Sequence, residues 1–437
     1  MKHVFRPLAS LLALLLLILP LAACGNRNRK TLLTLDRDGT KVSLSVNFYR
    51  FQLSRLKGSF VGYGYTNAGG DASDDAFWSL QDKFDGGDKL QTWDEYYRAQ
   101  VLETCKIYLV GLWVFEKNDL KLSETAKQNI QAELDDLVND YGNGSKTKLN
   151  AVLAAYGVNY RMLKDVYETE AKLETAQDFL YGANASGLGS TVKEEYLNAH
   201  YLRFKQIFFA KYDYEYITDG NGDVVYYDAD GNILYNTKTG YPKTVNGKTV
   251  YYLSADSARI AYDYENGSPK YKTDAKGDVI RRELTADEAA NVLAESQAAY
   301  EQVRDGAESV FETVLANENG TSEFSDGYYL LRGTDYASVS SDLAYLSEIE
   351  QKLDGMEIGA VDWLASDSGY HIIRRYAPTE GAYNMEVNEV WFSSFADGLM
   401  AELFLAECET YLPQIAVDES VLAAAPSLAK TEANLEF

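Results

Sequence analysis

The sequence predicts an α+β protein in which a mainly helical first part precedes a strand-rich middle part and a returning helix. Three observations predict this class. Apolar residues recur at helical spacing over residues 92–181. Runs of valine and tyrosine alternate with Asp-Gly and Asn-Gly turns over residues 213–282. Helical spacing then returns at residue 285 and again over residues 387–412. Periods of about 3.6 and 2 residues are typical of helices and strands respectively.

The chain begins with the features of an export signal. Lys2, His3 and Arg6 form a short basic start. An uncharged apolar run from Leu8 to Ala23 follows, and Leu21-Ala-Ala-Cys24 closes the segment. This is the pattern of a secretory signal. The segment also resembles the lipobox of bacterial lipoproteins, in which the cysteine is lipidated and becomes the first residue. A spanning helix needs roughly 20 apolar residues, so an uncleaved membrane anchor is the less favoured alternative.

This resemblance implies a destination for the protein. We expect residues 1–23 to be removed and the mature chain to be anchored through lipid on Cys24 to the extracytoplasmic face of the cell membrane. Two or three acyl chains make a stable tether, whereas one chain anchors only marginally.

Acidic residues outnumber basic residues by 66 to 41, which gives a net charge of −25. Removal of residues 1–23 takes away Lys2 and Arg6 and no acidic residue, which leaves 39 basic residues and a net charge of −27. This charge argues against nucleic acid as a partner, because phosphate binding needs the opposite sign. It also favours solubility and repulsion from anionic lipid.

Cysteine and histidine are scarce in the mature chain. Cys105 and Cys408 lie in apolar, helical segments, which favours two buried thiols over a disulfide. No Cys/His spacing indicates zinc, and we expect no cofactor. His200 and His371 are the only histidines after residue 23, so the scope for histidine chemistry is narrow.

The first elements of the mature chain are predicted from turn and capping residues. Residues 31–49 read as a hairpin that turns at Asp38-Gly39, and the Gly- and Asp-rich residues 62–87 read as a surface loop. Thr92 and Glu95 form a capping box, and Ser123 caps the next helix. The expected helices cover residues 92–117, 123–141, 149–156 and 160–180, and a Gly/Ala/Ser linker follows over residues 182–190.

The middle of the chain combines a strand, an unusual Tyr-rich stretch and a helix. Residues 201–211 read as an aromatic strand, and residues 213–282 contain hairpin turn signals. The turns 219–223 and 228–232 have alternating oxygen groups as calcium loops do, but they lack the distal glutamate of an EF-hand, so turn chemistry is favoured. The tyrosines are typical strand residues, with a carbohydrate or peptide platform as the alternative.

Helix and strand signals then alternate to the end of the chain. Thr285 and Glu288 form a second capping box. Residues 324–376 read as strand, loop, helix and strand, residues 387–412 read as helical, and a polar tail follows.

Two segments near the end of this region carry a family resemblance. Gly355-Met-Glu-Ile-Gly-Ala-Val361, followed by Asp367-Ser-Gly-Tyr-His371-Ile-Ile, resembles the end of a parvulin-type peptidyl-prolyl isomerase domain. Further similarities occur in the same order along the chain. They are Phe204–Phe209 for the first strand, Thr285–Val314 for the first helix, and Ser325–Tyr329 for the turn into the next strand.

The helical residues 92–181 and 387–412 resemble the chaperone part of SurA- and PrsA-type foldases. The two resemblances imply a composite α+β fold. A helical SurA-like chaperone domain would occupy residues 24–190, and a parvulin-like domain residues 191–378, with 213–282 as an extra β-hairpin insertion. Residues 379–437 would form a C-terminal helix that packs back on the helical domain, and a tail.

The parvulin resemblance implies a polar network around two histidines beside an apolar proline pocket. His371 matches the histidine of the last strand, whereas Gln206 stands at the first-strand position. Glutamine forms hydrogen bonds but does not titrate, so the network is altered and isomerase catalysis stays open. A purely structural strand histidine is the equal alternative for His371, and His200 is not expected to substitute.

The same resemblance suggests residues for the pocket. Tyr345, Leu346 and Phe208 are the expected pocket residues. Glu318 and Glu323 are both candidates for the loop residue that is an acid or a thiol in the family.

These inferences lead to two functions of different classes. The first is a membrane-tethered foldase or chaperone that binds unfolded or proline-containing exported polypeptides, with or without peptidyl-prolyl cis–trans isomerase activity. The second is a non-catalytic lipoprotein that displays the hairpin-rich insertion as a module for binding a glycan or solute.

Overall fold

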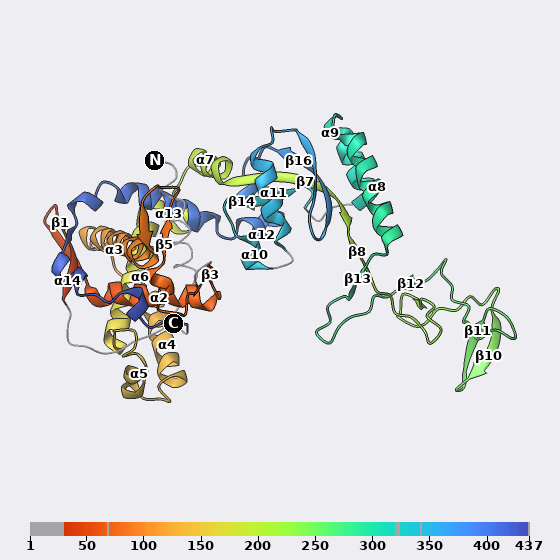
Figure 1. Cartoon of the computed structure of the whole chain (residues 1–437), viewed down its shortest axis with the longest axis horizontal. Helices are drawn as coiled ribbons and strands as arrows, with labels where there is room; N and C mark the ends of the chain where they lie inside the picture. The colour runs from red at the N-terminus through yellow and green to blue at the C-terminus, as the bar shows by residue number, and fades with distance from the viewer. Residues whose placement is uncertain (1–29, 68–69, 320–323, 341–342, 436–437) are drawn as a thin grey trace. The chain divides into compact units, whose positions relative to one another are not determined.

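The computed structural model describes residues 30–67, 70–319, 324–340 and 343–435. The chain divides into two compact units (Figure 1). Unit 1 combines Met1–Lys193 with Phe392–Phe437, and unit 2 is Glu194–Trp391. Both units combine helices with β-sheet, which confirms the mixed α+β class. The predicted signal segment and Cys24 lie outside the described residues. None of the helices in the described ranges combines the length and the apolar character that crossing a bilayer requires.

The sheet of unit 1 has three strands in the order β17-β1-β2. β1 (Thr31–Arg37) and β2 (Thr40–Ser45) form the predicted hairpin, and Asp38 and Gly39 turn it with φ values of 50° and 80°. The predicted hairpin was too long, because helix α2 (Val46–Gly62) begins directly after Ser45. The Ser45 hydroxyl accepts a hydrogen bond from the Phe48 amide and so caps this helix.

Helix α2 lies inside unit 1 and is buried on nearly all sides from Val46 to Gly58. The described residues that follow, up to Gly87, are mostly irregular, but they are not the plain surface loop predicted for residues 62–87. Phe77 and Trp78 are completely buried, and the Trp78 indole donates a hydrogen bond of 3.1 Å to the Ala72 carbonyl. The short elements here are β3 (Thr66–Asn67), β4 (Gly70–Asp71), η1 (Phe77–Ser79), β5 (Gln81–Lys83) and β6 (Leu90–Thr92).

Helix α3 (Trp93–Lys117) is the centre of unit 1 and packs against α2, α6 and α13. Both hydrogen bonds of the predicted capping box form: the Glu95 amide donates to the Thr92 hydroxyl at 3.0 Å, and the Thr92 amide donates to the Glu95 carboxylate at 2.9 Å. The next helices are α4 (Glu124–Asp140), α5 (Lys146–Val152) and α6 (Tyr160–Tyr181). The α5 helix begins three residues before its predicted start and ends four residues before its predicted end.

The expected linker after α6 is an ordered turn in the structure. The Gly187 amide donates to the Tyr181 carbonyl at 2.8 Å, and Ala185 is buried in η2 (Ala183–Ala185). Helix α7 (Ser190–His200) follows and crosses the boundary between the units.

The C-terminal part of unit 1 returns to the helical core. α13 (Phe395–Cys408) contacts α3 and α6. The short α12 (Glu389–Phe392) precedes it and belongs to unit 2 except for Phe392. The tail is ordered rather than simply polar, since Leu428 is completely buried and the Asn434 amide donates to the Ser54 carbonyl at 3.0 Å. Its elements are η6 (Leu412–Gln414), β17 (Ala416–Val417), α14 (Glu419–Ala423) and η7 (Leu428–Lys430).

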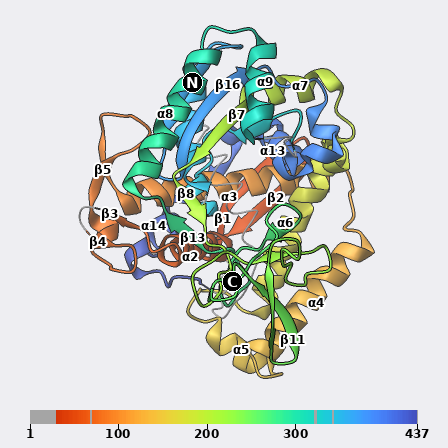
Figure 2. The same ribbon diagram turned by 90° about the vertical axis from the view of Figure 1, so that its right-hand side faces the viewer.

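Unit 2 is built on a four-stranded antiparallel sheet in the order β14-β7-β16-β15. One apolar core joins a face of this sheet to α11, and a second core joins the opposite face to α8 and α9. Figure 2 shows α8 and α9 beside β7 and β16. The elements are β7 (Tyr201–Ala210), α8 (Ala286–Val303), α9 (Glu308–Asn319), β14 (Tyr328–Leu331), α10 (Tyr336–Val339), α11 (Tyr345–Asp354), β15 (Val361–Ala365) and β16 (Gly369–Tyr376).

The resemblance placed a single helix over residues 285–314. The structure has two helices there, because α8 ends at Val303 and α9 begins at Glu308. Residues 379–391, which the sequence grouped with the C-terminal helix, belong to unit 2 and contain η4 (Ala382–Asn384) and η5 (Glu386–Asn388).

The insertion runs from β8 (Tyr212–Tyr214) to β13 (Arg281–Glu283), which pair with each other. Between them lie β9 (Tyr226–Tyr227), β10 (Tyr241–Val245), β11 (Lys248–Tyr252), β12 (Ser268–Pro269) and several isolated bridges. Only the β10–β11 pair is a regular hairpin, and Asn246-Gly247 turns it.

Three turns of the insertion share one conformation. In each, an aspartate carboxylate accepts a hydrogen bond from the amide four residues later, at 3.1, 2.8 and 2.9 Å for Asp219, Asp228 and Asp274. Turn chemistry therefore accounts for the two calcium-like motifs.

Candidate functional site

The register of the central sheet brings the predicted site residues together. In the β7–β16 pair, His371 lies opposite Phe208 and Ile373 lies opposite Gln206. Because side chains of directly paired residues point to the same face of a sheet, all four side chains share one face. This is the face that α11 covers.

His371 and Gln206 contact each other directly. The His371 Nδ1 and the Gln206 Oε1 are 3.0 Å apart, and the His371 Nε2 lies 2.8 Å from the Ser366 hydroxyl. An amide oxygen only accepts hydrogen bonds, so with this amide orientation Nδ1 carries the proton. Nε2 is then the acceptor, and the Ser366 hydroxyl donates to it. Both ring nitrogens are satisfied in the neutral imidazole.

The electrostatics favour this neutral form. The His371 side chain is completely buried. Burial lowers the pKa of His371 from 6.5 to about 4, and the positive charge of Lys211 lowers it further in the same direction. The Lys211 ammonium donates to the Ser366 carbonyl, which holds it close to the site. The imidazole is therefore uncharged near neutral pH and does not exchange protons with a ligand there.

Aromatic rings lie against the His371 imidazole. Tyr345 stacks on it with ring centroids 5.1 Å apart and an interplanar angle of 13°, and Phe208 lies at 4.9 Å. Burial raises the pKa of the Tyr345 phenol, and a hydrogen bond with the Gln206 side chain partly opposes this rise. The polar groups thus form a chain from Tyr345 through Gln206 and His371 to Ser366.

The expected pocket residues have different roles in the structure. Tyr345 and Phe208 flank His371, whereas Leu346 points into the core beside Phe204 and Ile373. The protein's own rings thus occupy the space next to the imidazole, and a proline ring enters only if they move.

A pocket of unit 2 lies on the other face of the sheet. It is an open hollow of about 460 Å³ lined by Tyr300 and Glu301 of α8 and by Asp362 and Trp363 of β15, together with Gln297. His371 does not contribute to it. The hollow is therefore separate from the Gln206–His371 pair.

Ser366 was not among the residues predicted from the sequence. It begins the turn between β15 and β16 and precedes His371 by five residues, so it sits at the end of the same hairpin. Its hydroxyl also accepts from the Gly369 amide at 3.3 Å. The Ser-Asp-Ser-Gly turn before a strand histidine is the signal that identifies it.

The other candidates lie elsewhere. His200 ends α7 and contacts Tyr196, and Glu318 is exposed near the end of α9. Glu323 lies outside the described residues. Cys105 and Cys408 are free and buried, as expected, and burial raises the pKa of both thiols. They are therefore inert as nucleophiles.

Unit 1 contains a buried polar cluster that the sequence did not reveal. The Arg55 guanidinium, with 3% of its side chain exposed, pairs with the Glu170 carboxylate, and the Gln52 amide donates to the same carboxylate at 3.3 Å. Glu133 lies near this pair. Burial of its carboxyl group raises its pKa to about 7, and repulsion from the Glu170 carboxylate is a smaller cause of the same rise.

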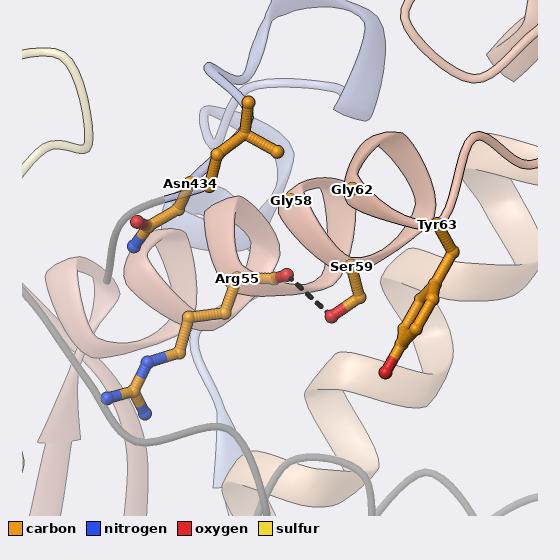
Figure 3. Close-up of a pocket in the computed structure, with 7 residues that line it drawn as sticks. Arg55, Gly58, Ser59, Gly62, Tyr63 and Asn434 are labelled. Atoms are coloured by element: carbon orange, nitrogen blue, oxygen red, sulfur yellow. Dashed lines mark hydrogen bonds between the residues drawn. The ribbon is translucent and has the colours of Figure 1, made fainter. Parts of the chain in front are cut away.

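A small open pocket of about 200 Å³ adjoins this cluster, between α2 and the C-terminal tail (Figure 3). Gly58 and Gly62 lie on its α2 side, Tyr63 and Asn434 flank it, and the Ser59 hydroxyl donates to the Arg55 carbonyl at 3.2 Å. The side-chain amide of Asn434 is buried with neither its Oδ1 nor its Nδ2 in a hydrogen bond, whereas its backbone amide binds the Ser54 carbonyl.

These features define a protein with a buried, neutral glutamine–histidine pair at the centre of an antiparallel sheet. A scan of protein-family models and a search of curated proteins give no match. Among solved structures the chain is similar to the crystal structure of PrsA from Bacillus subtilis, at 14% identity over 80% of this chain and 91% of that chain. The TM-score is 0.17, so this likeness carries no argument about fold or function.

Proposed function

We propose that the protein is an extracytoplasmic foldase or chaperone that binds unfolded exported polypeptides, with unit 2 as a parvulin-like peptidyl-prolyl isomerase domain. One observation carries this proposal: Gln206 of β7 and His371 of β16, which the sequence resemblance paired across 165 residues, hydrogen-bond at 3.0 Å. The order of elements supports it, because β7, α8, β14 and β16 follow one another as the resemblance implies.

The chemistry of the pair limits what the domain does. Rotation about a prolyl amide needs no proton transfer and no covalent intermediate, because its barrier of about 18–20 kcal/mol comes from amide resonance. A neutral, desolvated hydrogen-bonding chain is compatible with such a reaction. However, Tyr345 and Phe208 lie against the imidazole. Polypeptide binding is therefore the main activity in this proposal, and turnover depends on movement of these rings.

Membrane tethering is a second part of the proposal. It rests on the Leu-Ala-Ala-Cys24 motif and the apolar run before it. Metabolic labelling with a radioactive fatty acid tests it. Label should enter the native chain and be lost from the Cys24→Ala variant, and label in both chains would contradict the tether.

The test of the foldase uses the soluble chain from Gly25 to Phe437, which keeps every described residue. We expect this chain to suppress the aggregation of a chemically denatured client and to accelerate a refolding phase limited by prolyl isomerisation. Suppression alone supports a chaperone without turnover. If neither aggregation nor refolding changes, the proposed function is wrong.

Two variants test the site within this function. Gln206→His restores the second histidine that the parvulin resemblance implies and should raise isomerase activity, whereas His371→Ala should lower it. His200→Gln is the matched control, because His200 lies on α7 and outside the hydrogen-bonded chain. If turnover is measurable and all three variants match the parent, then His371 has only a structural role.

A second function is favoured by one feature of the insertion. Tyr212, Tyr214, Tyr271 and Tyr216 form a continuous row of ring contacts with centroids 5.5, 5.1 and 4.9 Å apart. Such a row is a candidate platform for a glycan or solute. Deletion of residues 213–282 separates the two functions, because a foldase keeps its client binding and an insertion-borne receptor loses its ligand.

A further inference from the structure

The end of the insertion differs in charge from the rest of the chain. The protein has 66 acidic residues and a net charge of −25, yet residues 231–255 contain no acidic residue and three lysines, Lys238, Lys243 and Lys248. This segment includes the β10–β11 hairpin. Figure 1 places the hairpin at the end of the insertion that is remote from the four-stranded sheet of the same unit.

The register of the hairpin collects two of these lysines on one face. Tyr241 pairs with Tyr252, Lys243 with Val250, and Val245 with Lys248. Alternate residues of a strand point to the same face, and directly paired residues share a face. One side of the hairpin, the hairpin face, therefore carries Tyr241, Lys243, Val245, Lys248, Val250 and Tyr252.

The hairpin face and its surroundings are exposed and partly apolar. Tyr241 and Val245 are 50% and 39% exposed. Ile233 and Leu253 of the same acid-free segment are also exposed, at 43% and 55%, but they lie outside the hairpin face. Exposed apolar side chains that share one face with lysines give this face the amphipathic character of an interaction surface.

The lysines have few internal partners. The Lys243 ammonium lies 4.4 Å from the centre of the Tyr252 ring and donates to the Ser257 carbonyl at 3.1 Å, so its stem lies along the hairpin. Lys248 is exposed beside the Asn246-Gly247 turn. Lys238 lies outside the hairpin and near Asp263, whose pKa it helps to lower. The positive charge of the hairpin face therefore comes from Lys243 and Lys248.

We propose that the hairpin face docks on an anionic lipid surface. Lysine heads would contact the lipid phosphates while the tyrosine and valine side chains enter the interface, where amphipathic side chains are stabilised. The occupant is a membrane rather than a soluble polyanion, because a polyanion contacts the lysines but gains nothing from burial of the exposed Tyr241 and Val245 of the same face. Repulsion between the acidic chain and the same lipid would confine the contact to this face.

This inference does not depend on the tether at Cys24 or on client binding. The experiment uses the chain from Gly25 to Phe437, which lacks the lipidated cysteine. Co-sedimentation is measured with vesicles of phosphatidylcholine alone and with vesicles that also contain phosphatidylglycerol. We expect binding to the mixed vesicles, weak binding to phosphatidylcholine, and loss of binding at high salt.

Variants of the hairpin sharpen the test. Near an anionic membrane each lysine contributes about fivefold to binding, so Lys243→Gln with Lys248→Gln should weaken the partition constant by about thirtyfold. Lys248→Glu alone keeps the Lys243–Tyr252 contact and should still weaken it severalfold. Val245→Ser should also lower the partition constant, because it removes an apolar side chain that would be buried in the membrane interface. The matched control is Lys121→Gln with Lys148→Gln, which removes two exposed lysines of unit 1 and should change binding less than twofold.

Three outcomes overturn the proposal. The first is no binding of the parent chain to mixed vesicles, and the second is equal binding by the parent and both hairpin lysine variants. The third is binding to soluble polyphosphate that matches vesicle binding and is insensitive to Val245→Ser, which would identify a polyanion as the occupant. Client binding by the same variants is measured in parallel, so that a failed foldase assay is not mistaken for failed docking.

Discussion

Protonation of the buried His371 should destabilise unit 2 in mild acid. The pKa of this imidazole is about 4 in the folded protein, against an ordinary value of 6.5, mainly because the ring is buried. Between these two pH values the unfolded chain binds a proton that the folded protein does not bind. The free energy of unfolding therefore decreases as the pH decreases through this window, and it is unaffected by this group above pH 7.

The size of this effect follows from the gap between the two pKa values. At 1.36 kcal/mol for each pH unit, it amounts to about 3 kcal/mol between pH 6.5 and pH 4. The group has no exposed surface, so solvent screening gives little reduction. The variant His371→Gln keeps hydrogen-bonding groups near Gln206 and Ser366 but has no titrating group. It should therefore lack this part of the pH dependence, whatever its stability at pH 7.

Two measurements check the argument. Urea unfolding of unit 2 is compared at pH 7 and pH 4.5 for the parent, His371→Gln and the control His200→Gln. The imidazole carbon-bound proton is also followed by NMR, which is simple because the chain after residue 23 has two histidines. A measured pKa of 6 or above for His371, or the same pH dependence in the parent and in His371→Gln, would refute the reasoning.

Three further predictions concern unit 1. Glu170→Gln removes the partner of the buried Arg55 guanidinium, so the free energy of unfolding should fall by about 3–5 kcal/mol in urea titrations; a loss below 1 kcal/mol would contradict the buried pair. Glu133 has its pKa raised by burial, so its carboxylate destabilises the fold as the pH rises from about 4.5 through 7. Glu133→Gln should accordingly stabilise the protein by about 1 kcal/mol at pH 8, after allowance for solvent screening, and leave it unchanged at pH 4; the reverse order would exclude this assignment. Gly58→Ala places a methyl group against the Asn434 backbone. The C-terminal tail should therefore detach from α2 and become sensitive to carboxypeptidase. Unchanged digestion would show that the tail does not lie against α2.

Local signals predicted many elements from the sequence. The capping boxes at Thr92 and Thr285 mark helix starts because each depends on two side chains three residues apart, and both form as expected. The β7 and β16 strands were predicted for a similar reason, since aromatic and β-branched residues dominate them. These features need no knowledge of distant parts of the chain.

Features that depend on distant packing were missed. Helix α2 has no clear polar face because Gln52, Arg55 and Lys57 are buried with its apolar residues. The amphipathic pattern that identifies a surface helix is therefore absent. The tail was predicted as polar, yet Leu428 is completely buried. Its backbone amide donates a hydrogen bond to the carboxylate of Asp94 in α3, a residue 334 positions earlier in the sequence.

The candidate site was predicted in part. The resemblance brought Gln206 and His371 together, and their register in the sheet agrees with it. It did not foresee that Tyr345 stacks on the imidazole, because that contact depends on how α11 is rotated over the sheet. Ser366 was missed because a serine in a turn is ordinarily explained by the turn itself.

The insertion leaves and re-enters the sheet domain at a single narrow neck. Tyr212 and Glu283 are directly paired across β8 and β13, and Arg282 of this neck binds both Asp213 and Glu288. Paired positions of antiparallel strands have Cα atoms about 4.5–5.5 Å apart, so a two-residue turn such as Asn-Gly can join them directly. Another segment can therefore replace the whole insertion, in evolution or by design, without changing the path of β7 or the start of α8.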